Sequence, residues 1–407
     1  MSDSSRQPVI VAAARTPIGR YLGGLASLSA PELGALAIRA AVERSGVPGE
    51  EIEEVILGHV LQGGTGQAPA RQAMLRAGLP AGVSAVTVNK VCGSGLKAVM
   101  LAAQAIRAGD LQVAVAGGQE SMSNAPHYVY GMRGGVKIGD QQMVDGMIRD
   151  GLWCGTCGVH MGGHAEHTAR RGGVSRADQD AFAAASHRKA VAAQEAGKFA
   201  AEMVPVEVPG RKGPTVVDAD EGPRRDTTAE TLAKLRPAFA KDAPADMDAD
   251  SLSVTAGNAS SLNDGAAALL VTSEEYARAH GLRMLGRITG YATGAVEPRE
   301  LFFAPIHAVQ NLMRKGGTTI GDYDLIEANE AFASQALANG RGLGWDWDRV
   351  NVHGGAIALG HPIGASGARV LTTLLHAMQD RNARTGLATL CLGGGDAVAL
   401  SVERVDL

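Results

Sequence analysis

The regular alternation of short apolar runs with alanine-rich helical patterns is the feature of this sequence that most constrains its fold. Within the first 116 residues, the runs that read as strands cover residues 9–14, 54–58, 86–88 and 111–116. The helical patterns between them cover residues 30–42, 67–77 and 96–108. Such alternation predicts a mostly parallel sheet with helices on both faces. Ser29 is a suitable N-cap for the first helix, and Gly117-Gly118 is expected to stop the fourth strand.

The alternation is lost after about residue 121 and returns near residue 253. In between, glycine, methionine and histidine replace the regular pattern, and one clear helix is predicted from an N-cap at Ser175 to about Ala196. Beyond it, strands are predicted over residues 265–271, 287–292, 325–329, 386–391 and 397–403, with helices from residue 273 and over 304–315. We therefore expect an α/β chain of two related half-domains, residues 1–122 and 253–407, with an inserted loop domain over residues 123–252.

Composition and charge exclude several classes of protein. The chain has 407 residues, of which 45% are hydrophobic and 20% charged, as in a globular enzyme of two or three domains. A net charge of −4 without a basic block gives no support for nucleic acid as a partner. The first eight residues lack the apolar core of a signal peptide, and no run reaches transmembrane length. With four cysteines too few for a disulfide framework, we expect a cytoplasmic protein without a membrane partner.

Cys92 is the first candidate for chemistry. It ends the strand pattern that begins at Val86, and Gly93-Ser-Gly95 leads from it into the helical pattern that starts at Leu96. A thiol at a helix N-terminus lies near unpaired N–H groups and the positive end of the helix dipole. Its pKa can then fall from about 8.5 into a range of roughly 3.5–7.5, which makes a nucleophile. The alternative is a buried structural cysteine.

Three further glycine-rich corners in the second half carry polar or titratable side chains. They are Asn329-Glu-Ala-Phe-Ala333, the long segment 351–369 that contains His361, and Cys391-Leu-Gly-Gly-Gly395. A histidine can take the proton of Cys92, a second cysteine can move another proton, and the glycines leave main-chain N–H groups open to a substrate. The alternatives are a capping histidine at position 361 and a packed core thiol at position 391.

Taken in order, these motifs resemble the thiolase family. The matching segments are Ala14-Arg-Thr-Pro-Ile-Gly19, the Cys92 corner, His160-Met-Gly162, Thr255-Ala-Gly-Asn-Ala-Ser260, Asn263-Asp-Gly265, the Asn329 corner, residues 354–369 and Cys391-Leu-Gly-Gly-Gly395. The resemblance implies a thiolase-like fold, in which two related βαβαβαββ half-domains form an αβαβα layered arrangement with an inserted loop domain. It also implies a homodimer or homotetramer.

The family resemblance further implies an acetyl-CoA C-acetyltransferase, which condenses two acetyl-CoA molecules reversibly to acetoacetyl-CoA and CoA through an acyl-cysteine. A broader or longer-chain degradative 3-ketoacyl-CoA thiolase is the alternative. A ketoacyl synthase shares the fold but pairs its cysteine with two histidines or with His and Asn, and has no counterpart of Cys391. A non-catalytic acyl-CoA or lipid carrier is a more remote reading, since all four corners are intact.

The resemblance assigns a role to each corner. Cys92 would accept the acyl group, and His361 would lower its pKa and bind the thioester oxygen together with a water held by Asn329. Cys391 would be the general base, or would activate the thiol of CoA in thiolysis. Main-chain N–H groups of Cys92 and Gly393 would form a second oxyanion hole.

Contacts to CoA and the acyl group also follow from the resemblance. Residues at matching positions would contact the nucleotide (Arg224, Arg225), the pantetheine arm (Ser260, Phe239, Phe332) and the acyl group (His160, Met161). Acyl-CoA and CoA are then substrates and products, and neither a separate cofactor nor a metal is expected.

Three departures from the family pattern affect this interpretation. Cys154 and Cys157 form a Cys-x-x-Cys motif ahead of His160, His164 and His167, so a zinc or redox site is an alternative use of this segment. The aromatic residues missing from this segment before His160 could instead widen the acyl pocket. Residues 300–305 replace a glycine-rich turn. Asp396 follows the last glycine corner, where its charge could raise the pKa of Cys391.

Overall fold

The first half of the chain forms a sheet in which the strand order does not follow the sequence. The computed structural model describes residues 6–244 and 247–405. The strands of this half are β1 (Pro8–Arg15), β3 (Glu54–Gly58), β4 (Ser84–Val88), β5 (Val113–Ser121) and β12 (Asn263–Ser273), and β2 (Gly19–Arg20) pairs with β12. Their order is β4-β3-β5-β12-β1. β4 and β5 run parallel to β3, whereas β12 is antiparallel to both β5 and β1.

The second half repeats this order. Its strands are β13 (Gly286–Ala295), β14 (Leu325–Ala328), β15 (Thr385–Leu392) and β16 (Asp396–Glu403), in the order β14-β15-β16-β13. A parallel bridge between Val350 and Ile326 stands where β4 stands in the first half. β14 and β15 are parallel, whereas β16 is antiparallel to β15 and β13, as in the first half. A short antiparallel pairing of β1 with β13 joins the two halves.

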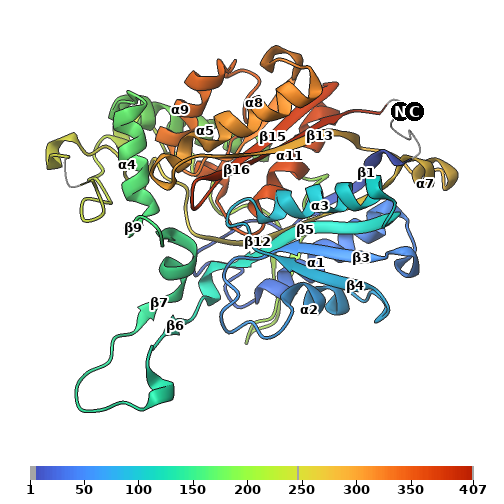
Figure 1. Cartoon of the computed structure of the whole chain (residues 1–407), viewed down its shortest axis with the longest axis horizontal. Coiled ribbons are helices and arrows are strands. Elements are labelled where there is room, and N and C mark those ends of the chain that lie inside the picture. Colours follow the sequence, from blue (N-terminus) through green and yellow to red (C-terminus); the bar gives the residue numbers. More distant parts are fainter. Residues whose placement is uncertain (1–5, 245–246, 406–407) are drawn as a thin grey trace.

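Helices form three layers around the two sheets (Figure 1). The outer helices of the first half are α1 (Ala30–Ser45) and α2 (Pro69–Arg76), and those of the second are α8 (Ala304–Gly316) and α9 (Ala333–Leu343). The central helices α3 (Ser94–Ala108) and α11 (Ser366–Asp380) pack against each other between the sheets. The short helices α7 (Glu274–Ala279) and α10 (Ala356–Leu359) lie at strand and loop ends. This is the αβαβα arrangement expected from the resemblance.

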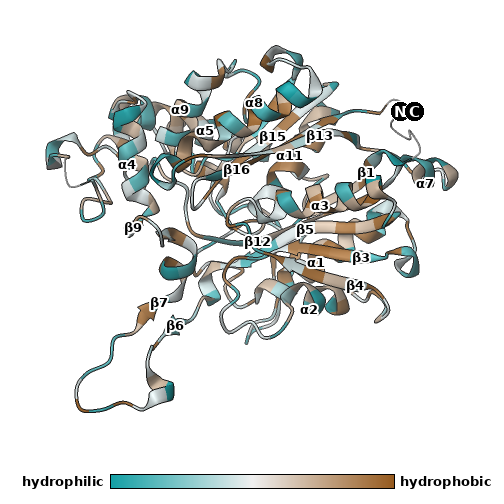
Figure 2. Cartoon of the chain, in the orientation of Figure 1, coloured by the Kyte–Doolittle hydropathy of each residue, from teal (hydrophilic) through white to brown (hydrophobic). Residues whose placement is uncertain are grey.

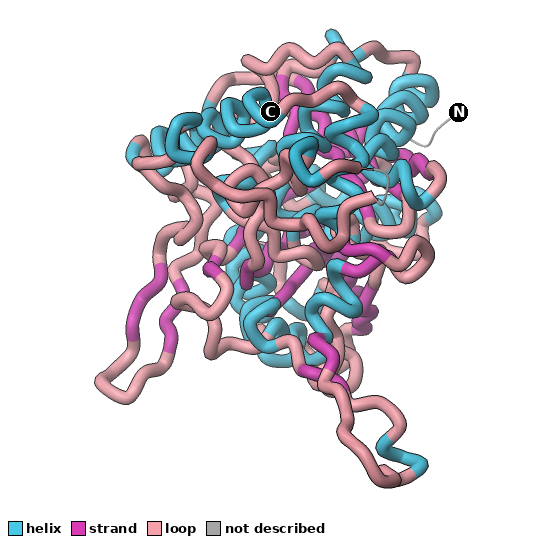
Figure 3. Tube along the Cα trace, turned by 90° about the vertical axis from the view of Figure 1, so that its left-hand side faces the viewer, coloured by secondary structure: helices cyan, strands magenta, loops and turns pink. Residues whose placement is uncertain are grey.

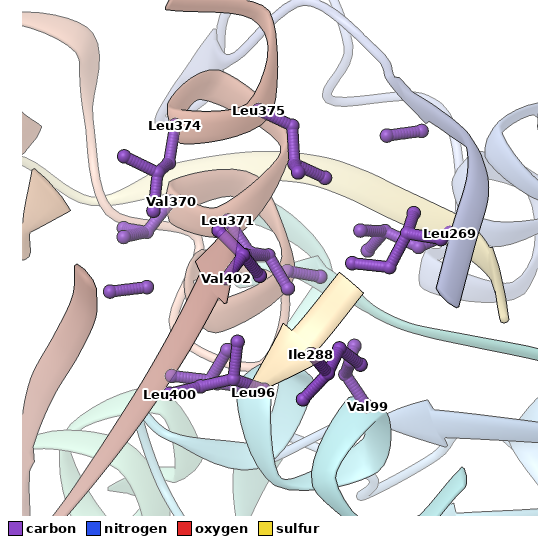
Figure 4. Close-up of a cluster of buried hydrophobic side chains, with 14 of the residues drawn as sticks. Leu96, Val99, Leu269, Ile288, Val370, Leu371, Leu374, Leu375, Leu400 and Val402 are labelled. Atoms are coloured by element: carbon purple, nitrogen blue, oxygen red, sulfur yellow. The ribbon is translucent and has the colours of Figure 1, made fainter. Parts of the chain in front are cut away.

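The central helices cross at two glycines. A Cβ atom on Gly367 would lie 2.3 Å from the main-chain nitrogen of Leu96, and one on Gly95 would lie 2.7 Å from that of Ala368. Behind this crossing, the helices bury a large aliphatic core against both sheets, with Leu96 and Val99 from α3 facing Val370 and Leu371 from α11 (Figure 4). Because both helices begin beside the crossing, their N-terminal corners are brought to the same part of the molecule.

The insertion joins β5 to β12 and extends away from the sheets. It contains α4 (Met161–Arg171), α5 (Arg176–Glu195), α6 (Ala229–Leu232) and the small strand pairs β6–β7 (His127–Tyr128, Val144–Asp145), β8–β9 (Trp153–Cys154, Val159–His160) and β10–β11 (Val206–Val208, Thr215–Val217). Buried Arg15 on β1 fixes it, through Glu202 at 2.5 Å and Asp220 at 2.7 Å. A long loop between β6 and β7 projects from the body (Figure 3).

Most predicted elements are confirmed, including the N-caps Ser29 and Ser175. Two predictions about the sheet are wrong. The sheet is mixed rather than mostly parallel, since β12 and β16 reverse direction in their halves. β5 also continues through Gly117-Gly118, because a strand ladder needs only main-chain groups.

The position of β12 also differs from the expected boundary at residue 253. This strand pairs with β5 and β1, so it completes the sheet of the first half. The insertion separates it from that half in sequence but not in space.

Hydrophobic residues concentrate on the strands, and hydrophilic residues on outer helices such as α4 and α8 (Figure 2). Residues 1–5, within the segment predicted to lack a signal peptide, lie outside the described residues. No helix among the described residues is long and apolar enough to cross a membrane.

Candidate active site

The corner between β4 and α3 is a tight, strained turn that presents Cys92. Ser94 closes it, because its Oγ accepts from the main-chain nitrogen of Lys90 at 2.8 Å and donates to the carbonyl of Val91 at 2.6 Å. Val91 adopts a φ of +46°, which is unfavourable for a β-branched residue. A backbone outlier of this kind persists only where the surrounding structure enforces it. The strain therefore falls on the residue directly before the half-buried Cys92.

The thiol of Cys92 accepts hydrogen bonds from two main-chain N–H groups, its own and that of Gly393. The resemblance named this same pair as an oxyanion hole. Burial nevertheless raises the pKa of Cys92 to about 12, and the carboxylate of Glu120 raises it further, so the two N–H groups offset only part of the change. This direction is opposite to the lowered pKa expected at a helix N-terminus, because desolvation outweighs the two N–H groups.

Cys391 lies at the end of β15 and is 1% exposed. Burial, and then the neighbouring Cys92, hold the pKa of Cys391 well above its usual range. Asp396, which was expected to act on this thiol, instead forms an ion pair with Lys90. That ion pair connects the turn before Cys92 with the turn after Cys391, so the two corners are linked across the halves of the molecule.

His361 is held in the loop before α11 and is 6% exposed. Its Nδ1 lies 2.6 Å from Oγ of Ser366, which itself donates to the carbonyl of Pro362 at 2.9 Å. Since the single Ser366 proton is used in that second bond, Nδ1 of His361 is the protonated nitrogen and Nε2 keeps its lone pair. Burial, and then Arg369, lower the pKa of His361 to about 3, so the imidazole is neutral near pH 7.

Asn329 follows β14 and faces this imidazole. Its amide nitrogen lies 3.5 Å from each ring nitrogen of His361, while its buried Oδ1 has no hydrogen-bond partner. Its neighbour Glu330 is fixed by Ser186 at 2.7 Å and Asn351 at 2.8 Å. The Asn329 corner is thus rigid, and the side-chain oxygen of Asn329 remains available to a ligand.

The predicted acyl and pantetheine residues gather next to Cys391. Met161, Phe239 and Phe332 belong to the same apolar cluster as that thiol. The ring of His160 stacks on Phe239 with centroids 5.1 Å apart. The main-chain nitrogen of Ser260 donates to the carbonyl of Ala331 at 3.0 Å, beside Phe332. The geometry therefore brings together five residues from four separate segments of the sequence.

Arg224 and Arg225 lie elsewhere, on the exposed side of α5. Both line a cavity of about 790 Å³ together with Arg188 and Thr228. Arg225 pairs with Glu195 at 2.6 Å, whereas the main-chain nitrogen of Arg224 donates to His187 at 3.1 Å. Three guanidinium groups around one cavity make this surface suited to phosphate groups.

Sequence reasoning missed several residues that support the site. Phe302, within the 300–305 departure, packs against Phe332 with ring centroids 5.3 Å apart and so adds an aromatic ring to the cluster. Buried Glu120 accepts from the main-chain nitrogens of Val60, Leu61 and Gly364 and thereby holds the His361 loop near the Cys92 corner. Glu120 could have been suspected, because a carboxylate follows an apolar strand there. Ser366 carried no signal beyond its proximity to His361.

Two thiols, a neutral imidazole and paired main-chain N–H groups define a site suited to acyl transfer through a cysteine. Comparison with known proteins agrees with this class. Family models for the thiolase N-terminal and C-terminal domains match residues 8–275 and 282–404. The chain belongs to the thiolase family.

Several relatives are similar over nearly their full length. An acetyl-CoA acetyltransferase of Pseudomonas aeruginosa is 57% identical over 97% of this chain and 99% of its own. One from Chromobacterium violaceum is 56% identical with the same coverage. Among solved structures, the acetyl-CoA acetyltransferase of Bacillus anthracis has a TM-score of 0.95 at 40% identity, over 99% of this chain and all of that one.

Proposed function

We propose that this protein is an acetyl-CoA C-acetyltransferase, an acyltransferase that condenses two acetyl-CoA molecules to acetoacetyl-CoA and CoA and also catalyses the reverse thiolysis. The observation that carries the proposal is the convergence of Cys92, Cys391 and the N–H of Gly393 at the junction of the two halves. The printed names of the relatives support the same reaction.

In the first step, Sγ of Cys92 attacks the thioester carbonyl of acetyl-CoA. Its proton passes to Nε2 of His361, whose lone pair is left free by the Nδ1 bond to Ser366. The thioester C–S bond then breaks, and the leaving CoA sulfur takes a proton from Cys391, which is left as a thiolate while His361 keeps the proton of Cys92. Because Cys92 and His361 both start neutral, the proton transfer between them accompanies the attack.

In the second step, the Cys391 thiolate left by the first step removes a proton from the methyl group of another acetyl-CoA and becomes a thiol again. The enolate oxygen is stabilised by His361 and by a water held at Asn329, whose buried Oδ1 is otherwise unpartnered. The enolate carbon attacks the acyl carbonyl on Cys92, and the resulting oxyanion accepts from the N–H groups of Cys92 and Gly393. Collapse breaks the C–S bond to Cys92, whose sulfur takes its proton back from His361, and releases acetoacetyl-CoA. In thiolysis, Cys391 activates the thiol of CoA.

The insertion supplies substrate binding in this proposal. Residues 123–252 would carry most CoA contacts, whereas the flanking parts, 1–122 and 253–407, supply the reacting groups, with β12 completing the first half. Arg224 and Arg225 would bind the nucleotide phosphates, Ser260, Phe239 and Phe332 the pantetheine arm, and His160 and Met161 the acyl group. CoA is substrate and product, and we propose no further cofactor for the reaction. Two thiols that must stay reduced fit a cytoplasmic location.

A homodimer or homotetramer also forms part of the proposal. The projecting loop between β6 and β7 exposes large apolar side chains, with Ile138 and Met143 among the most exposed in the described residues. Exposed apolar groups of this kind mark association surfaces. Sedimentation analysis should give a multiple of the chain mass, and replacement of Ile138 and Met143 by Ser should shift it downward.

The chain-length alternative is testable by CoA-dependent cleavage of 3-ketoacyl-CoAs of increasing length. Phe302 against Phe332 fills space beside Cys391, which favours short substrates. We expect acetoacetyl-CoA to be cleaved with the highest kcat/KM. A higher kcat/KM for longer substrates would instead indicate the degradative enzyme, and cleavage of none would favour the carrier.

A further inference from the structure

The hairpin formed by β8 and β9 brings two thiols together outside the catalytic site. Its turn is Cys154-Gly-Thr-Cys-Gly158. The main-chain nitrogen of Cys157 donates to Sγ of Cys154 at 3.3 Å, and that of Gly158 donates to the carbonyl of Cys154 at 2.8 Å. Gly158 has a φ of +69°, which a glycine adopts without strain. The turn is therefore built to hold both sulfur atoms on one side with an N–H group directed at one of them.

His164, in the first turns of α4, supplies a third group. Its side chain is 2% exposed, and its Nε2 has no hydrogen-bond partner. Its other ring nitrogen is bonded to the main chain of Arg299. Buried ring nitrogens in folded proteins are normally paired, so a free one directed into the interior indicates a ligand. Metal-binding histidines usually donate their second N–H to a carbonyl or carboxylate, which matches the Arg299 contact.

Each of the two neighbouring histidines has one ring nitrogen in a hydrogen bond. Nδ1 of His160 accepts from the main-chain nitrogen of Gly162 at 3.0 Å, as an N-cap of α4. Nε2 of His167 lies 2.8 Å from a carboxylate oxygen of Glu300. Nδ1 of His167 is also buried without a hydrogen-bond partner, but the ligand atoms found close together are those of Cys154, Cys157 and His164. The structure thus groups His164 with the two thiols.

The ligand atoms of Cys154, Cys157 and His164 all lie within 4.8 Å of one another. A tetrahedral zinc ion with Zn–S bonds of about 2.3 Å and Zn–N bonds of about 2.0–2.1 Å needs separations of roughly 3.5–3.8 Å. A contraction of at most about 1.3 Å would therefore form the site. Two thiolates neutralise the charge of one Zn²⁺, so the ion can be bound here without leaving a net charge. A cavity of about 420 Å³ at Cys157 and His164 gives the ion a route of entry.

We propose that Cys154, Cys157 and His164 bind a Zn²⁺ ion, with the fourth position open to water from the adjoining cavity. The two thiols release their protons to solvent as the Zn–S bonds form. Bound there, the ion would fix the β8–β9 hairpin on the start of α4, which carries His160 and Met161. Its role is structural, and the metal-free site expected from the resemblance would then describe the catalytic centre alone.

The test uses the full chain, reduced and stripped of metal, then equilibrated with Zn²⁺ alone and freed of excess. We expect one zinc per chain by elemental analysis, and cobalt substitution should give the thiolate charge-transfer band of a tetrahedral site. Cys157→Ser removes one ligand from an exposed position and should weaken zinc binding by roughly 100-fold or more. The matched control, Cys92→Ser with Cys391→Ser, also removes thiols but should still bind one zinc.

Several results would overturn the proposal. One is absence of stoichiometric zinc in the reduced wild type at micromolar free zinc. A second is zinc binding that is undiminished in Cys157→Ser. A third is loss of zinc in the control variant, which would show that the catalytic thiols bind the metal. A Cys154–Cys157 disulfide formed in preference to the metal complex under reducing conditions would identify a redox pair instead. Circular dichroism confirms that each variant is folded, and the metal content is independent of acyltransfer activity, so each proposal can fail separately.

Discussion

The corners that precede the central helices α3 and α11 occupy equivalent positions in the two halves of the fold but have different chemical roles. The corner before α3 is a strained turn around Val91 that leaves Cys92 half-buried. The corner before α11 is a deeply buried loop that holds His361 by Ser366 and by Oδ1 of Asn263, at 2.8 Å from its main-chain nitrogen. The repeated fold therefore supplies two positions at one junction, one for a nucleophile and one for a proton acceptor.

Burial moves the pKa values of these two groups in opposite directions. It disfavours the charged form of each, so the pKa of Cys92 rises to about 12 and that of His361 falls to about 3. Near pH 7 the pair is a thiol beside a neutral imidazole, not a thiolate beside an imidazolium. The difference between the corners is thus one of geometry and chemical role, while both share a neutral resting state.

Removal of the nucleophile should have the largest effect. Cys92→Ala eliminates the group that forms the acyl-enzyme, so kcat for thiolysis of acetoacetyl-CoA should fall on the order of 10⁴-fold or more. The condensation of acetyl-CoA should fall by a similar factor, because both directions pass through the same intermediate. Steady-state assays with a thermal unfolding control measure this. Retained turnover at even a tenth of the wild-type rate would contradict the role of Cys92.

Removal of the amide on the other corner should cost less. Asn329→Ala deletes the group that faces His361 and would hold the water for the enolate oxygen. The loss in kcat should be about 10²–10³-fold, as for one oxyanion-hole donor. Isotope exchange of the acetyl-CoA methyl protons, which requires the enolate, should slow in parallel. A change confined to KM would show that Asn329 only binds substrate.

The pH dependence of alkylation tests the neutral resting state. Only the thiolate reacts with iodoacetamide, and a raised pKa leaves little thiolate at pH 7. The rate of Cys92 alkylation should therefore keep rising with pH, about 100-fold between pH 7 and 9 if titration alone controls it. Peptide mass spectrometry follows the modification at Cys92. A rate that is already level at pH 7 would mean a low-pKa thiolate and would reverse this part of the comparison.

The bond that fixes His361 should have a moderate effect. Ser366→Ala removes the acceptor of the Nδ1 proton, so Nε2 is no longer held as the free lone pair and kcat should fall about tenfold with KM little changed. Ser334→Ala is a matched control, because Ser334 is equally buried and donates to the carbonyl of Ala165 away from His361. Equal losses of kcat in Ser366→Ala and Ser334→Ala would show that Ser366 contributes only to packing. An unchanged pH profile of kcat in Ser366→Ala would show the same.

The ion pair between the corners should have the smallest effect. Lys90 and Asp396 are both partly exposed, so their pairing should contribute only about 0.2–1 kcal/mol to the free energy of unfolding. Lys90→Ala and Asp396→Asn should each change kcat by less than about threefold. A double-mutant cycle in denaturant measures the coupling. A loss above tenfold would mean that this pair sets the distance between Cys92 and Gly393.

Local patterns allowed much of the fold to be predicted but little of its assembly. The strand over residues 54–58 has the bounds that its apolar run predicted, and helix caps such as Ser175 are readable from a few neighbouring residues. The sheet position of β12 was not predictable, because it depends on partners 140 and more residues away across the insertion. The strand at Val350 is reduced to a bridge, which no local pattern could show.

In the candidate site, too, local sequence predicted some features, whereas others depend on distant segments of the chain. Its residue types were recognisable because thiols, imidazole and amide beside glycines indicate a nucleophile with proton-transfer groups, and the resemblance to the thiolase family supplied the acyl-transfer reaction. Their protonation was not, since the direction of the Cys92 pKa depends on burial created by distant segments. Ser366 and Phe302 act only through three-dimensional contacts with His361 and Phe332, so their contributions became visible in the folded chain.

The most direct test of the account is the site of acetylation. Wild-type protein is mixed with acetyl-CoA in the absence of free CoA, quenched in acid, digested and examined by peptide mass spectrometry. The account predicts one acetyl group on the peptide that contains Cys92, with release of an equivalent amount of CoA. Acetyl on Cys391 in place of Cys92, or turnover without any acetylated cysteine, would contradict it.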